Sequence, residues 1–379
     1  MTAGDAPTFR WLHTGHEALT AMLAAIRAAR RSIRLEFYIF SAAPPGREFL
    51  EALVEARQRQ VRVQVLIDAV GSFGLPQSFW KPLLAAGGEF RWFNSIQFAR
   101  LGYRNHRKIL VVDEQTACIG GFNIAPEYNG DGVSWGWRDL GLHITGPPAA
   151  ELARAADAMF AQACTKLKLA QKLRRARTEI KNPHGRWQLL LSGPGLGHRL
   201  LKRAVTRDVA QARSVQIICG YFLPSWSIRR ALRRAARAGR KVQLMLAGQS
   251  DVPLSRLASH RLYQGLLLAG VEIYEYQPQI LHTKLIILDD RVHVGSANLD
   301  ARSLNINYEL LARLDDPALA AEARKIFARD LKHCRRIDPA TWKQSRNLCQ
   351  KLLERWAYFL FARVDPYLAR WTGRPKSGD

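Results

Sequence analysis

Two kinds of hydrophobic pattern alternate along this chain. Short apolar runs rich in β-branched residues predict buried strands, and stretches with helical spacing lie between them at intervals of about 30 residues. Two examples are Gln58–Asp68 and Ala238–Gly248, in which a basic helix end is followed directly by an apolar strand. This alternation predicts an α/β fold in which helices cover the faces of a mixed sheet.

The same order of segments occurs twice in the chain, which indicates an internal duplication. Ser214 follows Ser32 by 182 positions and His282 follows His106 by 176, so the spacing differs only by the length of a loop. The sequence therefore predicts two pseudo-symmetric α/β sandwich halves, residues 8–165 and 187–335, with a shared active site at their interface. Four pairs of segments correspond: 28–40 with 210–222, 58–68 with 238–248, 85–93 with 268–276, and 106–113 with 282–289.

Residues 166–186 form a basic linker between the two halves, with eight Lys or Arg residues and Glu179 as the single acid. The spacing from Ala150 to Ile180 predicts a helix that Asn182-Pro183 ends. Two interpretations stay open: a solvated connecting helix, or a basic patch that faces phosphate groups.

Residues 336–379 form a C-terminal tail with helical spacing of its apolar residues and basic residues between them. Pro366 is expected to kink or end its main helix. The tail is either an amphipathic helix in a membrane interface or an ordinary helix docked on the domain. The aromatic density of Trp356–Phe361 favours the membrane.

Charge narrows the range of partners. The chain has 57 Lys and Arg against 32 Asp and Glu, a net charge of +25, yet 47% of its residues are hydrophobic, so it is not a disordered basic protein. A basic folded surface favours nucleic acid or an anionic membrane as partner. No apolar run approaches the ~20 residues of a membrane span, and no signal peptide is expected at the N-terminus. Five scattered cysteines without a Cys-x-x-Cys pair indicate a reduced compartment and no structural zinc.

The candidate chemistry lies in two His-x-Lys pairs, His106-x-Lys108 and His282-x-Lys284. Residues two apart on a strand share one face, so each pair presents an imidazole and an ammonium together. If the halves pack symmetrically, both pairs converge on one spot. Two imidazoles and two ammonium groups together suit the binding of a phosphodiester. The lysines would neutralise its oxygens, one histidine would attack phosphorus, and the other would protonate the leaving alkoxide. No metal and no cofactor is expected.

Other polar residues recur near each pair. Asp113 and Asp289 follow their histidines by seven positions, an odd number that turns them away from the site and favours a structural role. Small and amide residues after each strand are expected to approach phosphate: Gly121 and Asn123 in the first copy, Ser296 and Asn298 in the second. The carboxylates expected to orient the histidines are Asp139 and Glu309, and the sequence leaves open which of them serves which histidine.

Two such motifs, at residues 100–127 and 276–303, resemble the duplicated His-Lys-Asp (HKD) motif of the phospholipase D superfamily. The chain is most similar to bacterial cardiolipin synthases of the shorter type, without N-terminal membrane spans. Stretches that carry this similarity are Arg34–Ile39, Trp137–Asp139, Gly220–Pro224, Ala247–Asp251, Ile273–Tyr276 and Gly295–Asp300. One departure is that five residues separate Asp289 from Gly295, where the family and the first copy have six, which shortens a hairpin.

This resemblance implies a phosphohistidine mechanism without a metal, in which the motif contributes His106, Lys108, Asp113, His282, Lys284 and Asp289. It favours His106 as the nucleophile and His282 as the acid and base. The implied reaction converts two phosphatidylglycerols, or a similar lipid pair, into cardiolipin and glycerol. The implied place is the anionic cytoplasmic face of the bacterial membrane, with peripheral attachment.

Two alternatives within the superfamily keep the same residues: a phospholipase D that hydrolyses its lipid, and a nuclease. A nucleic acid partner is not expected, because the chain has no separate recognition motif and its tail is rich in aromatic residues. Transfer of the lipid group requires that water be kept out of the site. Six aromatic residues are candidates for an apolar entrance, with ordinary packing as the other interpretation: Phe73, Phe79, Trp80, Tyr103, Phe222 and Trp226.

Overall fold

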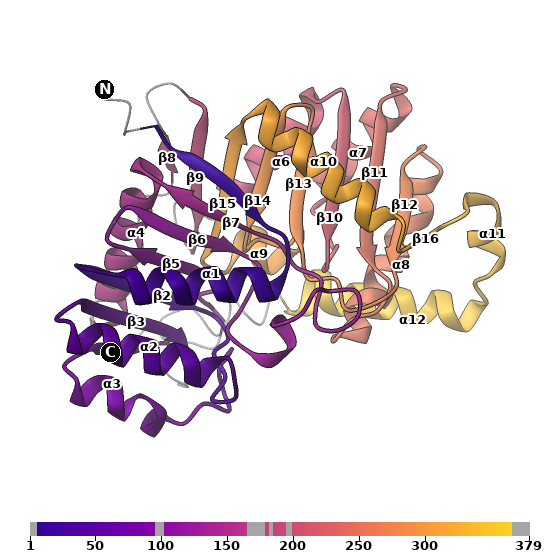
Figure 1. Ribbon diagram of the computed structural model, residues 1–379. Helices are drawn as coiled ribbons and strands as arrows, with labels where there is room; N and C mark the ends of the chain where they lie inside the picture. Colours follow the sequence, from indigo (N-terminus) through magenta and orange to yellow (C-terminus); the bar gives the residue numbers. More distant parts are fainter. Residues whose placement is uncertain (1–5, 95–101, 165–178, 182–184, 195–198, 366–379) are drawn as a thin grey trace, which may run out of the picture.

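The computed structural model describes residues 6–94, 102–164, 179–181, 185–194 and 199–365. Two sheets lie side by side, each with helices on its outer face (Figure 1). The two α/β halves predicted from the duplication are therefore confirmed, and helices follow them at the C-terminal end.

The first sheet has seven strands in the order β1-β7-β6-β5-β2-β3-β4. The strands are β1 (Thr8–Leu12), β2 (Ser32–Phe37), β3 (Arg62–Asp68), β4 (Glu89–Phe93), β5 (Ile109–Val112), β6 (Thr116–Gly120) and β7 (Gly141–Thr145). The helices of this half are α1 (Gly15–Ala28), α2 (Gly46–Gln58), α3 (Lys81–Ala85) and α4 (Pro147–Cys164), with 3-10 turns at Gln77–Trp80 and Pro126–Tyr128.

The second sheet has nine strands in the order β16-β12-β11-β10-β13-β14-β15-β9-β8. The strands are β8 (Glu179–Lys181), β9 (Trp187–Ser192), β10 (Ser214–Cys219), β11 (Lys241–Ala247), β12 (Glu272–Tyr276), β13 (Lys284–Leu288), β14 (Arg291–Gly295), β15 (Glu309–Asp315) and β16 (Cys334–Arg336). The helices are α6 (Leu200–Gln211), α7 (Trp226–Arg237), α8 (Pro253–Leu267), α9 (Ala301–Asn305), α10 (Pro317–Leu331), α11 (Pro339–Gln344) and α12 (Leu348–Phe359), followed by a π-helical turn at Leu360–Val364.

The strand orders show the duplication directly. From β9 to β12 the second sheet repeats the order of the first from β1 to β4, and β8 and β16 extend it at its two edges. In both halves three parallel strands (β2-β3-β4 and β10-β11-β12) are joined to an antiparallel hairpin (β5-β6 and β13-β14). The hairpin loop is one residue shorter in the second copy, as the missing residue after Asp289 predicts.

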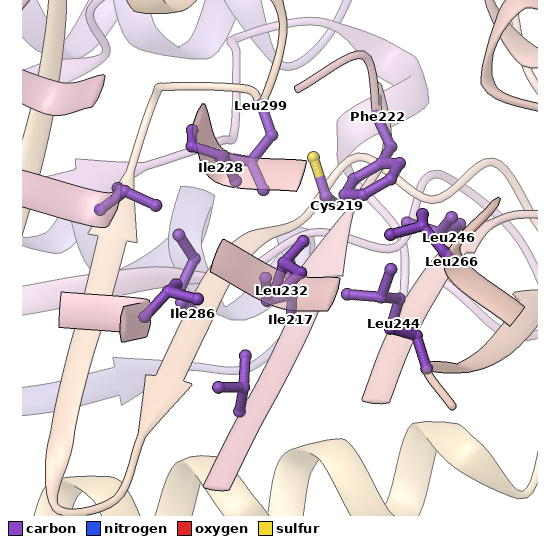
Figure 2. Close-up of a cluster of buried hydrophobic side chains, with 14 of the residues drawn as sticks. Ile217, Cys219, Phe222, Ile228, Leu232, Leu244, Leu246, Leu266, Ile286 and Leu299 are labelled. Carbon is purple, nitrogen blue, oxygen red and sulfur yellow. The ribbon is translucent and has the colours of Figure 1, made fainter. Parts of the chain in front are cut away.

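In the described residues the three largest hydrophobic clusters form layers, and a small fourth cluster lies around Phe93 and Tyr308. One layer lies between the first sheet and helices α1 and α2, and another lies between the second sheet and helices α6, α7 and α8. Figure 2 shows this second outer layer, with Leu232 of α7 close to Ile217 of β10 and Ile228 of α7 near Leu299. The middle layer contains residues of both sheets, including Leu142 of β7 and Leu310 of β15, so the two halves share one core.

The predicted helix from Ala150 to Ile180 is correct as far as Cys164, the last described residue of α4, and wrong at Ile180. Ile180 lies in strand β8, which pairs with β9 at the edge of the second sheet. Residues 165–178, and with them most of the basic linker, lie outside the described residues. Periodicity fails at Glu179–Lys181 because three residues carry too little pattern to reveal an edge strand.

Candidate active site

The two histidines lie where the halves meet, and a backbone hydrogen bond holds each of them against the opposite half. The His106 N–H donates to the carbonyl oxygen of Tyr308 (2.9 Å), and the His282 N–H donates to the carbonyl oxygen of Arg138 (2.8 Å). Each acceptor belongs to the opposite half and directly precedes a carboxylate residue, Glu309 or Asp139. The chain segments before β5 and β13 therefore run beside the segments before β15 and β7.

Each imidazole contacts the carboxylate of the other half. The Nδ1 atom of His106 lies 3.0 Å from Oε1 of Glu309, and Nδ1 of His282 lies 2.6 Å from Oδ2 of Asp139. An ionised carboxylate holds the imidazole proton on Nδ1, which leaves Nε2 free to react. This geometry answers the assignment that the sequence left open: Glu309 serves His106 and Asp139 serves His282.

The two carboxylates are themselves supported by the small residues that follow β6 and β14. The Ser296 hydroxyl donates to Glu309 and accepts the Leu310 N–H at 3.0 Å. In the first half a Cβ atom on Gly121 would lie 2.2 Å from an oxygen of Asp139. The first copy therefore has glycine where the second has serine, because the shorter carboxylate chain of Asp139 occupies the space of that side chain.

Lys108 and Lys284 are almost completely buried, and each ammonium donates to the carbonyl oxygen of its own histidine. Burial lowers the pKa of Lys108 to about 7, where the charge of Lys284 adds to the effect and Glu309 opposes it. Burial likewise lowers the pKa of Lys284. Both ammonium groups would gain stability from an anion, which is the property that a phosphodiester site needs.

The histidines are neutral and their partner carboxylates ionised in the free protein. Burial lowers the pKa of His282 to about 3, the charge of Lys284 lowers it further, and Asp139 acts against both. Burial also lowers the pKa of His106, although Glu309 acts against it. Burial alone would raise the pKa values of Asp139 and Glu309, but the neighbouring histidines and lysines hold them below the ordinary range.

Two asparagines complete the candidate phosphate site. The Oδ1 atom of Asn123 accepts the N–H of Ile39 at 3.0 Å. Within the described part of the chain, Nδ2 of Asn123 and Oδ1 of Asn298 are buried polar atoms without a hydrogen-bond partner. A buried polar group without a partner is costly, so a ligand oxygen that accepts from the Asn123 amide would relieve this cost.

Asp113 and Asp289 do not belong to this cluster. The carboxylate of Asp113 accepts three backbone N–H groups, from Arg30 (2.9 Å), Arg31 (2.7 Å) and Ser32 (2.8 Å). In the second half Asp289 accepts the N–H groups of Arg213 and Ser214. Both residues tie the turn at the end of the hairpin to the start of the neighbouring strand, so the geometry favours a structural role for them.

Sequence reasoning missed a set of buried charges beneath His106. Asn105 donates its side-chain amide to Glu36 (2.8 Å) and its backbone N–H to Asp68 (2.9 Å), so the residue before the histidine is held on two sides. Arg107 and Arg104 face the same two carboxylates. The available signal was the charged sequence Arg104–Lys108 together with acids inside the apolar strands β2 and β3.

Three tyrosines near the histidines were also missed. The rings of Tyr38 and His106 lie 4.9 Å apart, and the rings of Tyr128 and His282 lie 5.3 Å apart. Tyr221, whose ring lies 6.3 Å from that of His282, donates its hydroxyl to Asp251 at 2.5 Å. Aromatic residues are common in cores, so only the contact with the histidines distinguishes these three.

Two kinds of feature are absent from the described residues. No group of three or more His, Cys, Asp or Glu side chains there is arranged to hold a metal ion. No helix there has both the length and the apolar character to cross a membrane.

Comparison with known proteins identifies the family. The family described as "Cardiolipin synthase, PLD-like domain" matches residues 22–134 and 205–331, which include both His-x-Lys pairs. The chain belongs to the cardiolipin synthase family of the phospholipase D superfamily. It is thereby a cardiolipin synthase-like phosphatidyltransferase, as the resemblance of its two motifs predicts.

Individual relatives agree with this assignment. The chain is 31% identical to cardiolipin synthase 1 of Bacillus cereus over 93% of its own length and 72% of that protein, and 34% identical to cardiolipin synthase 2 of the same organism over 86% and 65%. Among solved structures, the phosphatidylserine synthase of Haemophilus influenzae matches with a TM-score of 0.70 and 17% identity, covering 95% of this chain and 94% of that chain. This last similarity concerns the fold.

Proposed function

We propose that this enzyme transfers a phosphatidyl group from one phosphatidylglycerol to the hydroxyl of another, giving cardiolipin and glycerol through a phosphohistidine intermediate. The observation that carries the proposal is the pair of imidazoles, each held at Nδ1 by a carboxylate of the opposite half, beside two buried lysines. The names of the relatives point to cardiolipin as the product, and phosphatidylglycerol is the substrate that the family resemblance implies. The geometry alone does not distinguish these lipids from other phosphodiesters.

In the first step Nε2 of His106 attacks phosphorus, and the bond from phosphorus to the glycerol oxygen breaks. Lys108, Lys284 and the free amide of Asn123 stabilise the charge on the non-bridging oxygens. His282 gives a proton to the leaving glycerol oxygen. Its low pKa in the free protein means that it must gain this proton when the anionic substrate binds and raises its pKa.

In the second step the same atoms act in reverse order. His282, now neutral, takes the proton of the hydroxyl on the second phosphatidylglycerol, whose oxygen attacks phosphorus. The bond between phosphorus and His106 breaks, and the diester product leaves. One phosphodiester replaces another, so this exchange needs no external source of energy. Water in place of the second lipid would give phosphatidic acid, the product of the hydrolytic alternative.

The proposed location is the cytoplasmic face of the bacterial membrane, with peripheral attachment. A net charge of +25 suits an anionic leaflet, where each Lys or Arg near the surface contributes about 1 kcal/mol. The substrate resides in that leaflet, so attachment would also bring the enzyme to its lipid.

The test is incubation of the purified protein with phosphatidylglycerol vesicles and separation of the lipid products. Cardiolipin with an equal amount of glycerol supports transfer, and phosphatidic acid supports hydrolysis. A single-stranded oligonucleotide under the same conditions tests the nuclease alternative. His106→Ala is the matched control, and cardiolipin formed equally by this variant would contradict the mechanism.

A further inference from the structure

Helix α12 has one face docked on the second half, and this face accounts for its position. Ala357 and Glu354 are buried, and Tyr358 and Phe361 pack against the core layer beneath α7 and α8. Figure 1 shows α12 along the lower edge of that half. The predicted C-terminal helix is thus confirmed, and the interpretation as a helix docked on the domain holds for this face.

The other face of α12 is apolar and exposed. Docking of the helix on the second half does not require apolar residues on this face. Five large apolar side chains there are between 44% and 78% exposed: Leu348, Leu352, Leu353, Trp356 and Phe359. Four of them recur at intervals of three or four residues, so they form a stripe along one side of the helix. Glu354, the single acid of α12, belongs to the buried face.

This stripe reaches the neighbourhood of the candidate active site. Beyond α12, Asp365 forms a bidentate ion pair with Arg302 of α9, four residues after Asn298. Tyr358 lies under the guanidinium of Arg229 in the first turn of α7. That turn begins with Trp226, which is 63% exposed, and it follows the β10 loop that carries Tyr221 beside His282.

The aromatic residues expected at an apolar entrance to the site divide into buried and exposed ones. Trp80 and Phe222 are fully buried core residues, so ordinary packing explains them, and Phe79 also packs against the core. Phe73 and Trp226 are exposed, and both follow strands whose ends face the site, β3 and β10. Tyr103, the sixth candidate, is half-buried and belongs to neither group. Exposure separates the other five, and sequence alone does not reveal it.

The first turn of helix α7 contacts α12 through Arg229 and Tyr358, and the helix carries positive charge. Its residues, 226–237, include five Arg residues and no acid. Arg230 lies 4.9 Å above the ring of Trp226, and Arg230, Arg233, Arg234 and Arg237 are exposed. In the described residues, none of these four arginines has an ion-pair partner within 4.0 Å. Their charge is therefore available to an external anion.

We propose that the exposed stripe of α12, together with Trp226 and the exposed arginines of α7, is the surface by which this protein binds an anionic phospholipid bilayer. We call it the docking surface. The apolar stripe would enter the interface between headgroups and acyl chains, and the arginines would contact lipid phosphates. This inference rests on the proposed function, because a lipid substrate must pass from the bilayer to the histidines.

Point substitutions test this surface better than truncation does. Removing the tail after about Asp338 would uncover the second core layer, since Trp342 and Ala357 belong to it. Trp356→Ser with Phe359→Ser changes only exposed side chains of α12. Arg230→Glu with Arg233→Glu changes the charge of α7.

Matched controls lie away from the docking surface. Leu268→Ser with Leu84→Ser removes two exposed apolar side chains at the ends of α8 and α3. Lys241→Glu with Lys325→Glu makes the same change in net charge, at the first residue of β11 and on α10. The measurement is sedimentation of the full-length protein with vesicles of phosphatidylglycerol or of phosphatidylcholine, over a salt series.

We expect the Trp356/Phe359 variant to lose about 10- to 100-fold in partition to phosphatidylglycerol vesicles, most visibly at high salt, where charge is screened. We expect the Arg230/Arg233 variant to lose about tenfold or more at low salt and to discriminate less against phosphatidylcholine. Both control variants should bind like the unchanged protein. Equal binding by test and control variants would overturn the proposal. Tight binding of an oligonucleotide by the unchanged protein, lost only in the Arg230/Arg233 variant, would also overturn it.

Turnover of a short-chain, monomeric phosphatidylglycerol separates this inference from the proposed function. We expect the docking-surface variants to act on the monomeric lipid at the rate of the unchanged protein and to be slow only on vesicles. If the unchanged protein binds vesicles but converts neither substrate, the proposed function fails while the docking surface stands. Equal turnover of vesicles by all variants would overturn the docking surface.

Discussion

Nδ1 of His106 lies 3.0 Å from Oε1 of Glu309, a residue of the opposite half and 203 positions further along the chain. Nδ1 of His282 makes the equivalent contact with Asp139, 143 positions earlier. Neither half contains both a histidine and the carboxylate that orients it. The interface between the halves is therefore part of the catalytic arrangement that we propose.

Removing the charge of these carboxylates should impair turnover while the fold remains. Glu309→Gln and Asp139→Asn no longer fix the proton on Nδ1 or stabilise an imidazolium, so we expect kcat to fall by about 10²- to 10⁴-fold. Circular dichroism and thermal unfolding check the fold. Glu322→Gln is the control, because it removes a carboxylate 3.3 Å from His13, outside the site. An unchanged kcat in Glu309→Gln would exclude an orienting role.

The nucleophile can be identified with an activated phosphodiester. A nitrophenyl diester has a leaving group that needs no protonation, so His282→Ala should still release about one equivalent of nitrophenolate in a burst. His106→Ala should release none. Mass spectrometry of the quenched His282→Ala variant should locate the phosphoryl adduct on His106. A burst in His106→Ala alone would reverse the two assignments.

Lys108 should impose a pH limit on substrate capture. Its pKa of about 7 in the free protein means that it is cationic below this pH and neutral above it. The anionic phosphodiester needs the cation. The proton uptake of His282 already makes kcat/KM fall as pH rises, so this fall should steepen by about a further tenfold per pH unit above pH 7. Calorimetry in buffers of different ionisation enthalpy should show more proton uptake on binding at pH 8 than at pH 6. Lys108→Arg keeps its charge, so a variant that remains active should lose this steepening, and an identical profile would assign it to another group.

Asp113 should matter for stability more than for the reaction. Hydrogen bonds from three backbone N–H groups outweigh the effect of burial and lower its pKa, so its contribution is present above the unfolded pKa near 3.9 and lost as pH falls through the lower folded value. Because the carboxylate is only partly buried, we expect Asp113→Asn to cost only about 1 kcal/mol of unfolding free energy at pH 7. Urea unfolding measures this cost, with the exposed Asp290→Asn as control. A folded Asp113→Asn protein as inactive as His106→Ala would contradict the structural role.

Sequence predicted what is local or repeated. The strands and the duplication depend on spacing over a few residues, and they appear in the structure where the pattern places them. The two His-x-Lys pairs were expected on strands, but His106, Lys108 and His282 lie just before β5 and β13, and of the four residues Lys284 alone is in a strand. The pairing of His106 with Glu309 was not predictable, because it depends on how the halves pack and not on separation along the chain. The space that Asp139 takes beside Gly121 is likewise a property of two strands in contact. The two faces of α12 share one apolar pattern, and only the position of α8 decides which of them is buried.

The crossed contacts also bear on how such a chain can arise. A single half on its own would have a histidine without a carboxylate partner, so an ancestral unit of this kind would have to act as a two-fold dimer with two identical exchanges. Joining two copies in one chain removes the requirement that the exchanges stay identical. Here one exchange has an aspartate beside glycine and the other has a glutamate beside serine. A single chain with two halves can therefore give its two histidines unequal surroundings, as the separate roles of nucleophile and acid require.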